Sequence, residues 1–186
     1  MSSRKKILHI QVLPKLSGVQ HISLDILKHI SNEEYDKYIL FGNDAIDNNL
    51  KLQCINEFEK IGVKVFFVKN LYRVIGFKDI LAFLEIYKLC KEEMFDIVHT
   101  HSTKPGIIGR IAATLARTPL VIHTVHGLAF HKYIRFPLWQ FYWICEMVAS
   151  FFCNKIILVN KYYSKYFNFF RSKVSIIYNG IDFSEY

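Results

Sequence analysis

Short runs of β-branched and aromatic residues alternate with helical stretches along almost the whole chain, which restricts the folds open to it. Several runs are nearly continuous in Val, Ile, Leu and Phe, as is typical of strands buried on both faces of a parallel sheet. The runs lie at residues 6–13, 37–42, 63–68, 96–100, 120–125, 155–159 and 173–178. Helical periodicity occupies residues 19–31, 77–94, 106–117 and 136–153. This alternation predicts an α/β fold with a doubly wound parallel sheet.

Two of the predicted helices carry apolar stripes. The first stripe is Val19, Ile22, Ile26 and Ile30. The second is Phe77, Ile80, Leu81, Leu84 and Tyr87. The helix predicted at 136–153 is apolar nearly all round, but Glu146 interrupts its apolar run. No stretch gives 18 uninterrupted apolar residues, the length expected of a transmembrane helix.

The composition narrows the function without fixing it. A chain of 186 residues that is 52% hydrophobic can bury the core of one domain. A net charge of +8 favours anionic partners such as phosphates or an acidic membrane surface. Nucleic acid fits less well, because the basic residues are spread along the chain without an RNA- or DNA-binding motif. Four scattered cysteines without a C-x-x-C pair argue against a zinc site and a disulfide framework, and favour a reducing, cytoplasmic setting.

The loop after the first predicted strand is a candidate phosphate site. In an open parallel sheet, ligands bind beyond the carboxyl ends of the strands, where loops lead into helix N-termini. Ser17 can cap the next helix, and Gln20 completes an S-x-x-Q capping box. Gly18 opens the helix and lets the backbone approach a ligand, and free N–H groups at a helix start attract phosphate. An ordinary turn and cap explains the same residues equally well.

Two more loops place histidines at strand ends. In "VHTHSTKPGIIGR", His101 ends the strand, Lys104 adds charge at a helix start, and Pro105 suits the first helical turn. In "VIHTVHGLAF", His126 directly follows the strand and Gly127 permits a tight turn. His126 is therefore the strongest single catalytic candidate. The histidines within the strands, at positions 99 and 123, are interpreted as core residues.

The four histidines 99, 101, 123 and 126 also suggest a metal cluster, and with it a metal hydrolase. However, no Asp or Glu lies at these strand ends to complete a hydrolytic site, and the H-x-H spacing does not fix the reach of the imidazoles. We therefore predict that the protein has no metal site.

The segment 130–143 mixes aromatic and basic side chains. It holds both tryptophans, Trp139 and Trp143, together with Lys132 and Arg135. Such a mixture suits a membrane interface or a lipid-linked ligand. A buried helix would explain it nearly as well.

Five of these motifs together resemble family 4 glycosyltransferases. "KILHI…LSGVQH", "DIVHTHSTKPGIIGRIAA", "VIHTVHG", "KIILVN" and "IIYNGID" occur in the family's order. The resemblance covers the whole chain but only the N-terminal, acceptor-side domain of the family. It implies that residues 1–186 are a single Rossmann-like domain, one half of a GT-B architecture. The C-terminal nucleotide-sugar-binding domain of that architecture is absent, so the chain alone is expected to be inactive.

The resemblance also implies roles for individual residues. The loop with Ser17 and Gly18 would approach the donor phosphates, although the family often has two glycines there. His126 would lie in the cleft near the reacting sugar, and the loops with His101, Lys104 and Gly127 would face the acceptor. No general base is evident in the matching loops, which suits a retaining transfer in which the leaving phosphate takes the acceptor proton.

The implied function is a sugar transfer with retention, from a nucleotide-diphosphate sugar to a saccharide acceptor linked to a polyprenyl diphosphate. No bound cofactor is implied. The pathway would be capsule, lipopolysaccharide or other bacterial surface polysaccharide biosynthesis. The enzyme would be cytoplasmic, with peripheral contact to an anionic membrane at the inner face of the plasma membrane. The alternative is a non-catalytic assembly module that partners a separate nucleotide-binding subunit.

Overall fold

The computed structural model describes residues 4–131 and 133–180, and it contains seven strands, five α-helices and two short 3₁₀ helices. The strands are β1 (Lys5–Ile10), β2 (Tyr35–Phe41), β3 (Val63–Phe67), β4 (Ile97–His101), β5 (Leu120–Val125), β6 (Lys155–Leu158) and β7 (Val174–Ile176). The helices are α1 (Gly18–His29), α2 (Asn48–Lys60), α3 (Lys78–Glu93), α4 (Thr103–Leu115) and α5 (Leu138–Phe151), with 3₁₀ helices η1 (Lys161–Tyr166) and η2 (Asn168–Lys173).

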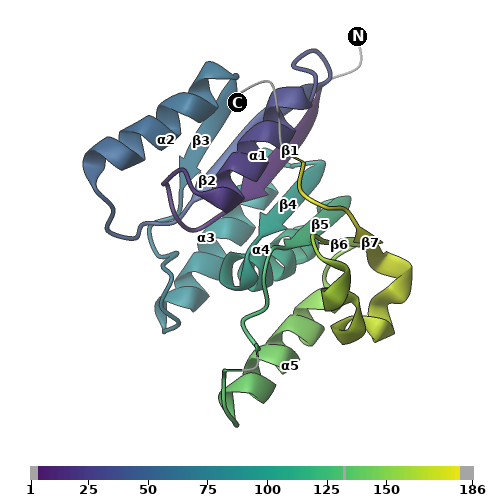
Figure 1. Ribbon diagram of the computed structural model, residues 1–186. Helices are drawn as coiled ribbons and strands as arrows, with labels where there is room; N and C mark the ends of the chain where they lie inside the picture. The colour runs from purple at the N-terminus through teal and green to yellow at the C-terminus, as the bar shows by residue number, and fades with distance from the viewer. Residues whose placement is uncertain (1–3, 132, 181–186) are drawn as a thin grey trace.

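All seven strands are parallel and form one sheet in the order β3-β2-β1-β4-β5-β6-β7 (Figure 1). The chain reverses its direction of travel across the sheet between β1 and β4, as in Rossmann-like folds. The predicted α/β doubly wound class is thus confirmed, and each predicted apolar run overlaps a strand. Loops at the carboxyl ends of β1 and β4 meet beside this reversal, which is where such folds bind ligands.

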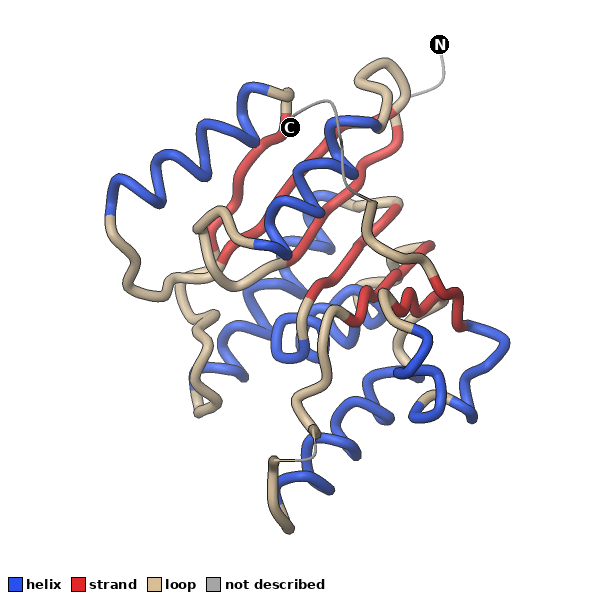
Figure 2. Tube along the Cα trace, in the orientation of Figure 1, coloured by secondary structure: helices blue, strands red, loops and turns tan. Residues whose placement is uncertain are grey.

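Helices cover both faces of the sheet, which forms the middle layer in Figure 2. Helices α1 and α2 lie over one face, where Leu27, Cys54 and Phe58 pack against β1, β2 and β3. Helices α3, α4 and α5 cover the opposite face, and Ala82, Ile86 and Ala112 belong to the larger core cluster there. The sheet therefore has a separate apolar core on each side.

Helix α2 was not predicted from the sequence. Its sequence, NNLKLQCINEFEK, is mostly polar and buries only Cys54 and Phe58, four residues apart. The helix begins after Asp47, whose carboxylate accepts hydrogen bonds from the backbone N–H groups of Asn49 and Leu50. This cap satisfies first-turn donors, and two anchors hold an otherwise solvated helix on the sheet.

The predicted apolar stripes of two helices are not their most buried faces, and only Ile30 and Tyr87 of the two stripes pack against a core cluster. In α1 the buried side chains are Gln20, Ser23 and Leu27, and the predicted stripe is only part-buried. In α3 the buried side chains are Ala82, Ile86 and Cys90, and four members of the predicted stripe are exposed: Phe77 (93%), Ile80 (64%), Leu81 (49%) and Leu84 (51%). The buried face of α1 is thus partly polar, and α3 presents apolar surface to its surroundings.

Helix α5 also exposes apolar side chains. Its exposed residues include Leu138, Phe141, Ile144, Val148 and Phe151. Its buried face holds Glu146, Ala149 and Ser150. Among the described residues, no helix has both the length and the apolar character needed to cross a membrane.

A buried ion pair joins α4 to α5. The Arg110 guanidinium lies 2.9 Å from the Glu146 carboxylate, and these side chains are 0% and 4% exposed. Arg110 Nε also donates to the carbonyl of Gly106 at 2.8 Å. Losing one partner of a buried pair leaves an uncompensated charge, which is strongly destabilising. The pair therefore fixes how the two helices lie against each other.

Gly106 is the closest approach of α4 to the sheet, and replacing it should destabilise the protein. A Cβ there would lie 2.4 Å from His123 Cε1. That ring is fully buried and its Nδ1 is 2.9 Å from Thr100 Oγ1, so it has little room to move. We expect Gly106→Ala to lower the free energy of unfolding in urea by about 1–3 kcal/mol. Gly76→Ala, whose Cβ would meet open space, is the matched control. Equal stability of the two variants would contradict the close contact.

Candidate functional site

The N-termini of α1 and α4 meet at a hollow of about 270 Å³ at the carboxyl edge of the sheet. Its lining includes Gln11, Ser17, Gln20, Arg73, Ser102 and Lys104. Helix N-termini carry unpaired N–H groups and positive partial charge, which favour anions. Of the two cations in the lining, Lys104 pairs with Asp79, so Arg73 contributes the net positive charge. The hollow is therefore suited to a phosphate-bearing ligand.

The predicted capping box at the start of α1 is wrong. Ser17 occupies the cap position, but its hydroxyl makes no cap hydrogen bond and instead donates to the Gln20 side-chain oxygen. The Gln20 amide nitrogen in turn donates to the carbonyl of Leu13 at 3.1 Å. Because the serine does not cap the helix, the first-turn N–H groups remain available to a ligand. A Cβ on Gly18 would meet nothing within 4 Å, so the fold does not require glycine there.

Lys104 is engaged within the protein. Its ammonium lies 2.5 Å from the Asp79 carboxylate and donates to the carbonyl of Val74. The two charged side chains are only 13% and 20% exposed. Arg73, which the sequence analysis did not single out, lines the same hollow and is exposed. Within the described part of the chain, its guanidinium forms no ion pair, so it is the more available cation.

A connected group of buried histidines lies beneath α1. His9 of β1 pairs with His99 of β4 in the sheet register, and His101 lies two residues further along the same face. His101 Nε2 is 3.1 Å from His9 Nδ1 and 3.2 Å from Ser23 Oγ. On its other side, His101 Nδ1 is 3.0 Å from His126 Nε2. The predicted candidates His101 and His126 are therefore in direct contact.

Hydrogen bonding in this group fixes which nitrogens carry protons. The Gln11 amide donates to Ser23 Oγ, which leaves the serine hydroxyl free to donate. His9 Nε2 is buried without a partner among the described residues, and an unpaired lone pair there costs less than an unpaired N–H. His9 is therefore protonated at Nδ1, so Ser23 donates to His101 Nε2.

The same order of protons continues to the edge of the sheet. His101 accepts at Nε2, so its proton lies on Nδ1 and is donated to His126 Nε2. His126 must then carry its own proton on Nδ1. Ser23, His101 and His126 thus form a row of hydrogen bonds, and each donor in this row polarises the next. The chain therefore ends in a His126 N–H that can donate a hydrogen bond to a ligand.

Burial keeps these imidazoles neutral. It lowers the pKa of His126 to about 4. Burial is also the main cause that lowers the pKa of His99 to about 3, and the neighbouring His126 lowers it further. The pKa values of His9 and His101 are also lowered, mainly by burial and further by neighbouring histidines. Neutral His126 is thus a poor proton acceptor and a suitable hydrogen-bond donor.

The four histidines considered as a metal cluster do not form one group. His123 lies on the opposite face, where Thr100 Oγ1 is 2.9 Å from its Nδ1. The ring nitrogens of His9, His99 and His101 do lie within 4.8 Å of one another. However, these rings already bond Ser23, Thr124 and each other. An ion would have to displace those bonds, so a protein without a metal site stays our prediction, which metal analysis of the purified protein tests.

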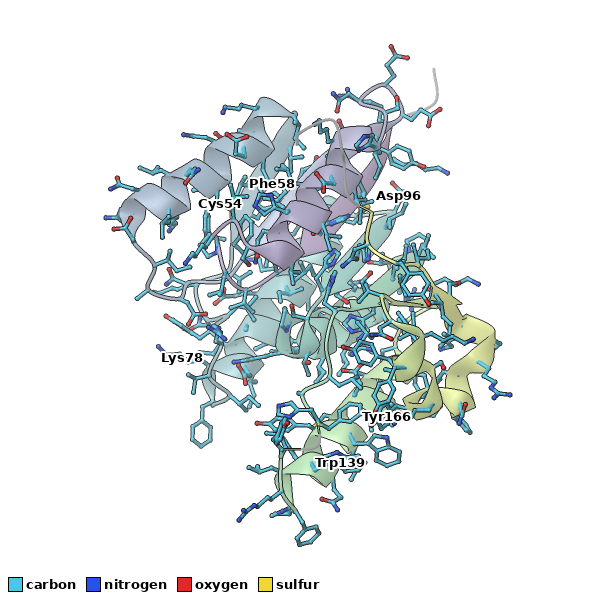
Figure 3. The ribbon with its side chains drawn as sticks, in the orientation of Figure 1. Cys54, Phe58, Lys78, Asp96, Trp139 and Tyr166 are labelled. Atoms are coloured by element: carbon cyan, nitrogen blue, oxygen red, sulfur yellow. The ribbon has the colours of Figure 1, made fainter. Side chains whose placement is uncertain are left out.

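The aromatic segment lies away from the hollow. Phe130 contacts Trp139 and Tyr166 edge-on, at centroid distances of 5.7 and 5.3 Å, and Figure 3 shows the latter two near α5. Trp143 stacks on Trp139 at 6.4 Å. Trp143 is 37% exposed and Arg135 is exposed, whereas Trp139 is part-buried. Lys132 lies outside the described residues. The segment is thus neither fully buried nor part of the hollow between α1 and α4.

Part of the site was predictable from the sequence. Ser17 and Lys104, both predicted, share the hollow, and the predicted His101 and His126 are hydrogen-bonded to each other. Gly127 follows His126 and is exposed. His9 was not predicted, although the alternation of β1 places His9 on one face and β1 lies next to β4 in a doubly wound sheet. Nothing in the sequence pattern pointed to Arg73.

A model of glycosyltransferase family 4 matches residues 18–185 of the chain. The chain is 36% identical over 189 residues to an Escherichia coli protein named UDP-Gal:alpha-D-GlcNAc-diphosphoundecaprenol alpha-1,3-galactosyltransferase, covering 99% of this chain and 47% of that protein. It is 32% identical over 85 residues to the Staphylococcus aureus capsular polysaccharide biosynthesis glycosyltransferase CapM, covering 46% of this chain and 22% of CapM. The chain thus spans less than half the length of these relatives.

A glycosyltransferase structure from Rickettsia africae has a similar fold. It superposes with a TM-score of 0.69 at 17% identity, over 97% of this chain and 44% of that one. At that identity the likeness concerns the fold alone.

Proposed function

The chain belongs to glycosyltransferase family 4, and on that premise we propose that it is the acceptor-side domain of a transferase. The enzyme moves a sugar with retention from a nucleotide-diphosphate sugar to a saccharide on a polyprenyl diphosphate. The nucleotide-binding domain is not within these residues, so the 186-residue chain does not turn over alone. The product is an intermediate of capsule, lipopolysaccharide or a related bacterial surface polysaccharide.

One observation carries the proposal: two helix N-termini and two cations surround a single hollow at the carboxyl edge of the sheet. Ser17 and Gly18 at α1 face the donor phosphates. Lys104 at α4 and Gly127 face the acceptor. The expectation that His101 also contacts the acceptor does not fit its complete burial, so His101 acts through its hydrogen bond to His126. The relative from Escherichia coli supports a lipid-linked acceptor, because its name describes a diphosphoundecaprenol acceptor.

In the transfer, the bond between the anomeric carbon and the donor phosphate breaks, and a bond to the acceptor oxygen forms. The leaving phosphate gains negative charge and takes the acceptor proton. Preorganised donors lower the energy of such a transition state. The His126 N–H and the first-turn N–H groups of α1 supply donors without a proton transfer. This division of roles needs no general base from the chain.

The exposed aromatic surface supports a peripheral position on the membrane. Trp143 and Arg135 lie on or beside α5, whose outer face is apolar. Trp139 and Lys132 belong to the same segment. Aromatic and basic side chains together suit the interface of an anionic bilayer. The enzyme would thus work at the inner face of the plasma membrane, where a lipid-linked acceptor is presented.

The test is transfer by the complete natural polypeptide. It is incubated with radiolabelled UDP-hexoses and an N-acetylglucosamine-diphosphate lipid, and label in the lipid extract is counted. We expect label from one donor, in a product whose new linkage keeps the donor's anomeric configuration by NMR. An inverted linkage would overturn retention. No transfer from any nucleotide sugar, with co-purification of a separate nucleotide-binding protein, would favour the assembly-module alternative.

A further inference from the structure

A second, apolar hollow adjoins the phosphate-binding one. It is a groove of about 680 Å³ between α4 and α5, lined by apolar residues that include Val74, Ile107, Ile108, Ile134 and Phe141. Its volume is within the range of small-molecule sites, and its lining is predominantly apolar. The Arg110–Glu146 pair holds the two helices that form its walls.

The two hollows meet at Arg73 and Lys104, which line both. A ligand that crosses this boundary would have a polar part on the phosphate side and an apolar part in the groove. Its charged group would lie between them. Asp79 also lines the groove and pairs with Lys104, so the net charge at the boundary rests on Arg73. Guanidinium groups bind phosphate oxygens in bidentate pairs.

We propose that the groove between α4 and α5 binds the isoprenoid chain of a polyprenyl diphosphate, with Arg73 contacting the diphosphate at its mouth. The inference rests on the proposed function and adds the position of the lipid. The sugar at the far end of the diphosphate then lies in the phosphate-side hollow, toward α1. The protein thereby holds the reacting hydroxyl at a fixed distance from the lipid.

Helix α5 offers a matched pair of variants. Phe141 and Ile144 are equally exposed, at 51%, and are three residues apart. Phe141 lines the groove and Ile144 does not. Lys78 is the control for the charge variant. It is an exposed cation at the start of α3 (Figure 3), and it lines neither hollow. Phe141→Ser and Arg73→Gln therefore test the site, with Ile144→Ser and Lys78→Gln as controls.

The experiment measures binding of farnesyl diphosphate and dimethylallyl diphosphate to the complete polypeptide by calorimetry, without donor or membrane. These probes share a diphosphate and differ in chain length. We expect the longer probe to bind at least about tenfold more tightly. Phe141→Ser should abolish most of that difference, Arg73→Gln should weaken both probes about tenfold, and the controls should change neither.

Equal affinity of the two probes for the unaltered protein would overturn the proposal. So would an equal loss in Phe141→Ser and Ile144→Ser, because that would indicate a general apolar surface. The assay needs no turnover, so a protein that binds farnesyl diphosphate but transfers no sugar contradicts only the proposed function. Equal transfer to acceptors with short and long lipid chains contradicts only the proposal that the groove binds the lipid.

Discussion

Lowering the pH from 7 to 5 is expected to destabilise the chain strongly, because five histidines are neutral in the folded state and would bind protons once unfolded. These are His9, His99, His101, His123 and His126, and burial is the largest cause lowering each pKa below 6.5. Below pH 6.5 the unfolded state binds more protons, so stability falls with pH, down to about pH 4 for His126.

The expected size of this effect is large. Each buried histidine lowers the free energy of unfolding by about 1.4 kcal/mol per pH unit below 6.5, which is about 2 kcal/mol at pH 5. Together the five approach the total stability of a typical domain, about 5–15 kcal/mol. Urea unfolding of the chain at pH 8, 7, 6 and 5, followed by circular dichroism, measures the loss.

A variant that removes one buried imidazole tests the cause. His99→Phe should reduce the slope of stability against pH by about one proton between pH 6.5 and 5. His21→Gln alters an exposed histidine of α1 and should leave the slope unchanged. A stability that stays constant from pH 7 to 5 would show that these imidazoles are solvated in the folded protein.

The fold was predictable because buried parallel strands have a recognisable sequence pattern. Strands β1, β2 and β5 are buried on both faces for most of their length, so they read as continuous apolar runs. Helix α2 was missed because two anchors, Cys54 and Phe58, suffice to hold it. The apolar stripe on α3 led to a different error, because it predicted a buried face that is largely exposed. The apolar side chains of the predicted stripe are mostly exposed, while a different face of the helix, with Ala82, Ile86 and Cys90, packs against the sheet.

The site was predictable only at strand ends. His101 and Lys104 stand where β4 becomes α4, so topology alone marked them. Their partners come from distant segments: Ser23 lies 78 residues from His101 in sequence, and His9 lies 92 residues away. Such pairs follow from sheet order and helix rotation, which a single sequence does not fix. Arg73 reaches the hollow from the loop after β3, and this loop has no helical or strand periodicity from which its position could be predicted.

Removing the His126 imidazole is expected to lower kcat of the complete enzyme by about 10²–10³, the cost of deleting one preorganised donor. The acceptor KM should change little, because the hydrogen bond strengthens as charge develops on the leaving phosphate. The comparison is steady-state transfer by His126→Ala and by the unaltered enzyme. His131→Ala, an exposed histidine five residues further along, is the control and should retain activity.

The kinetic split separates a catalytic role from a structural one. A fall in kcat with an equal rise in acceptor KM would indicate that His126 only shapes the loop. The tautomer gives a second reading that does not depend on turnover, since ¹⁵N NMR distinguishes the two ring nitrogens. The row from Ser23 through His101 requires the His126 proton on Nδ1. A proton on Nε2 would reverse the row, making His126 an acceptor toward the substrate, and would require another group to stabilise the leaving phosphate.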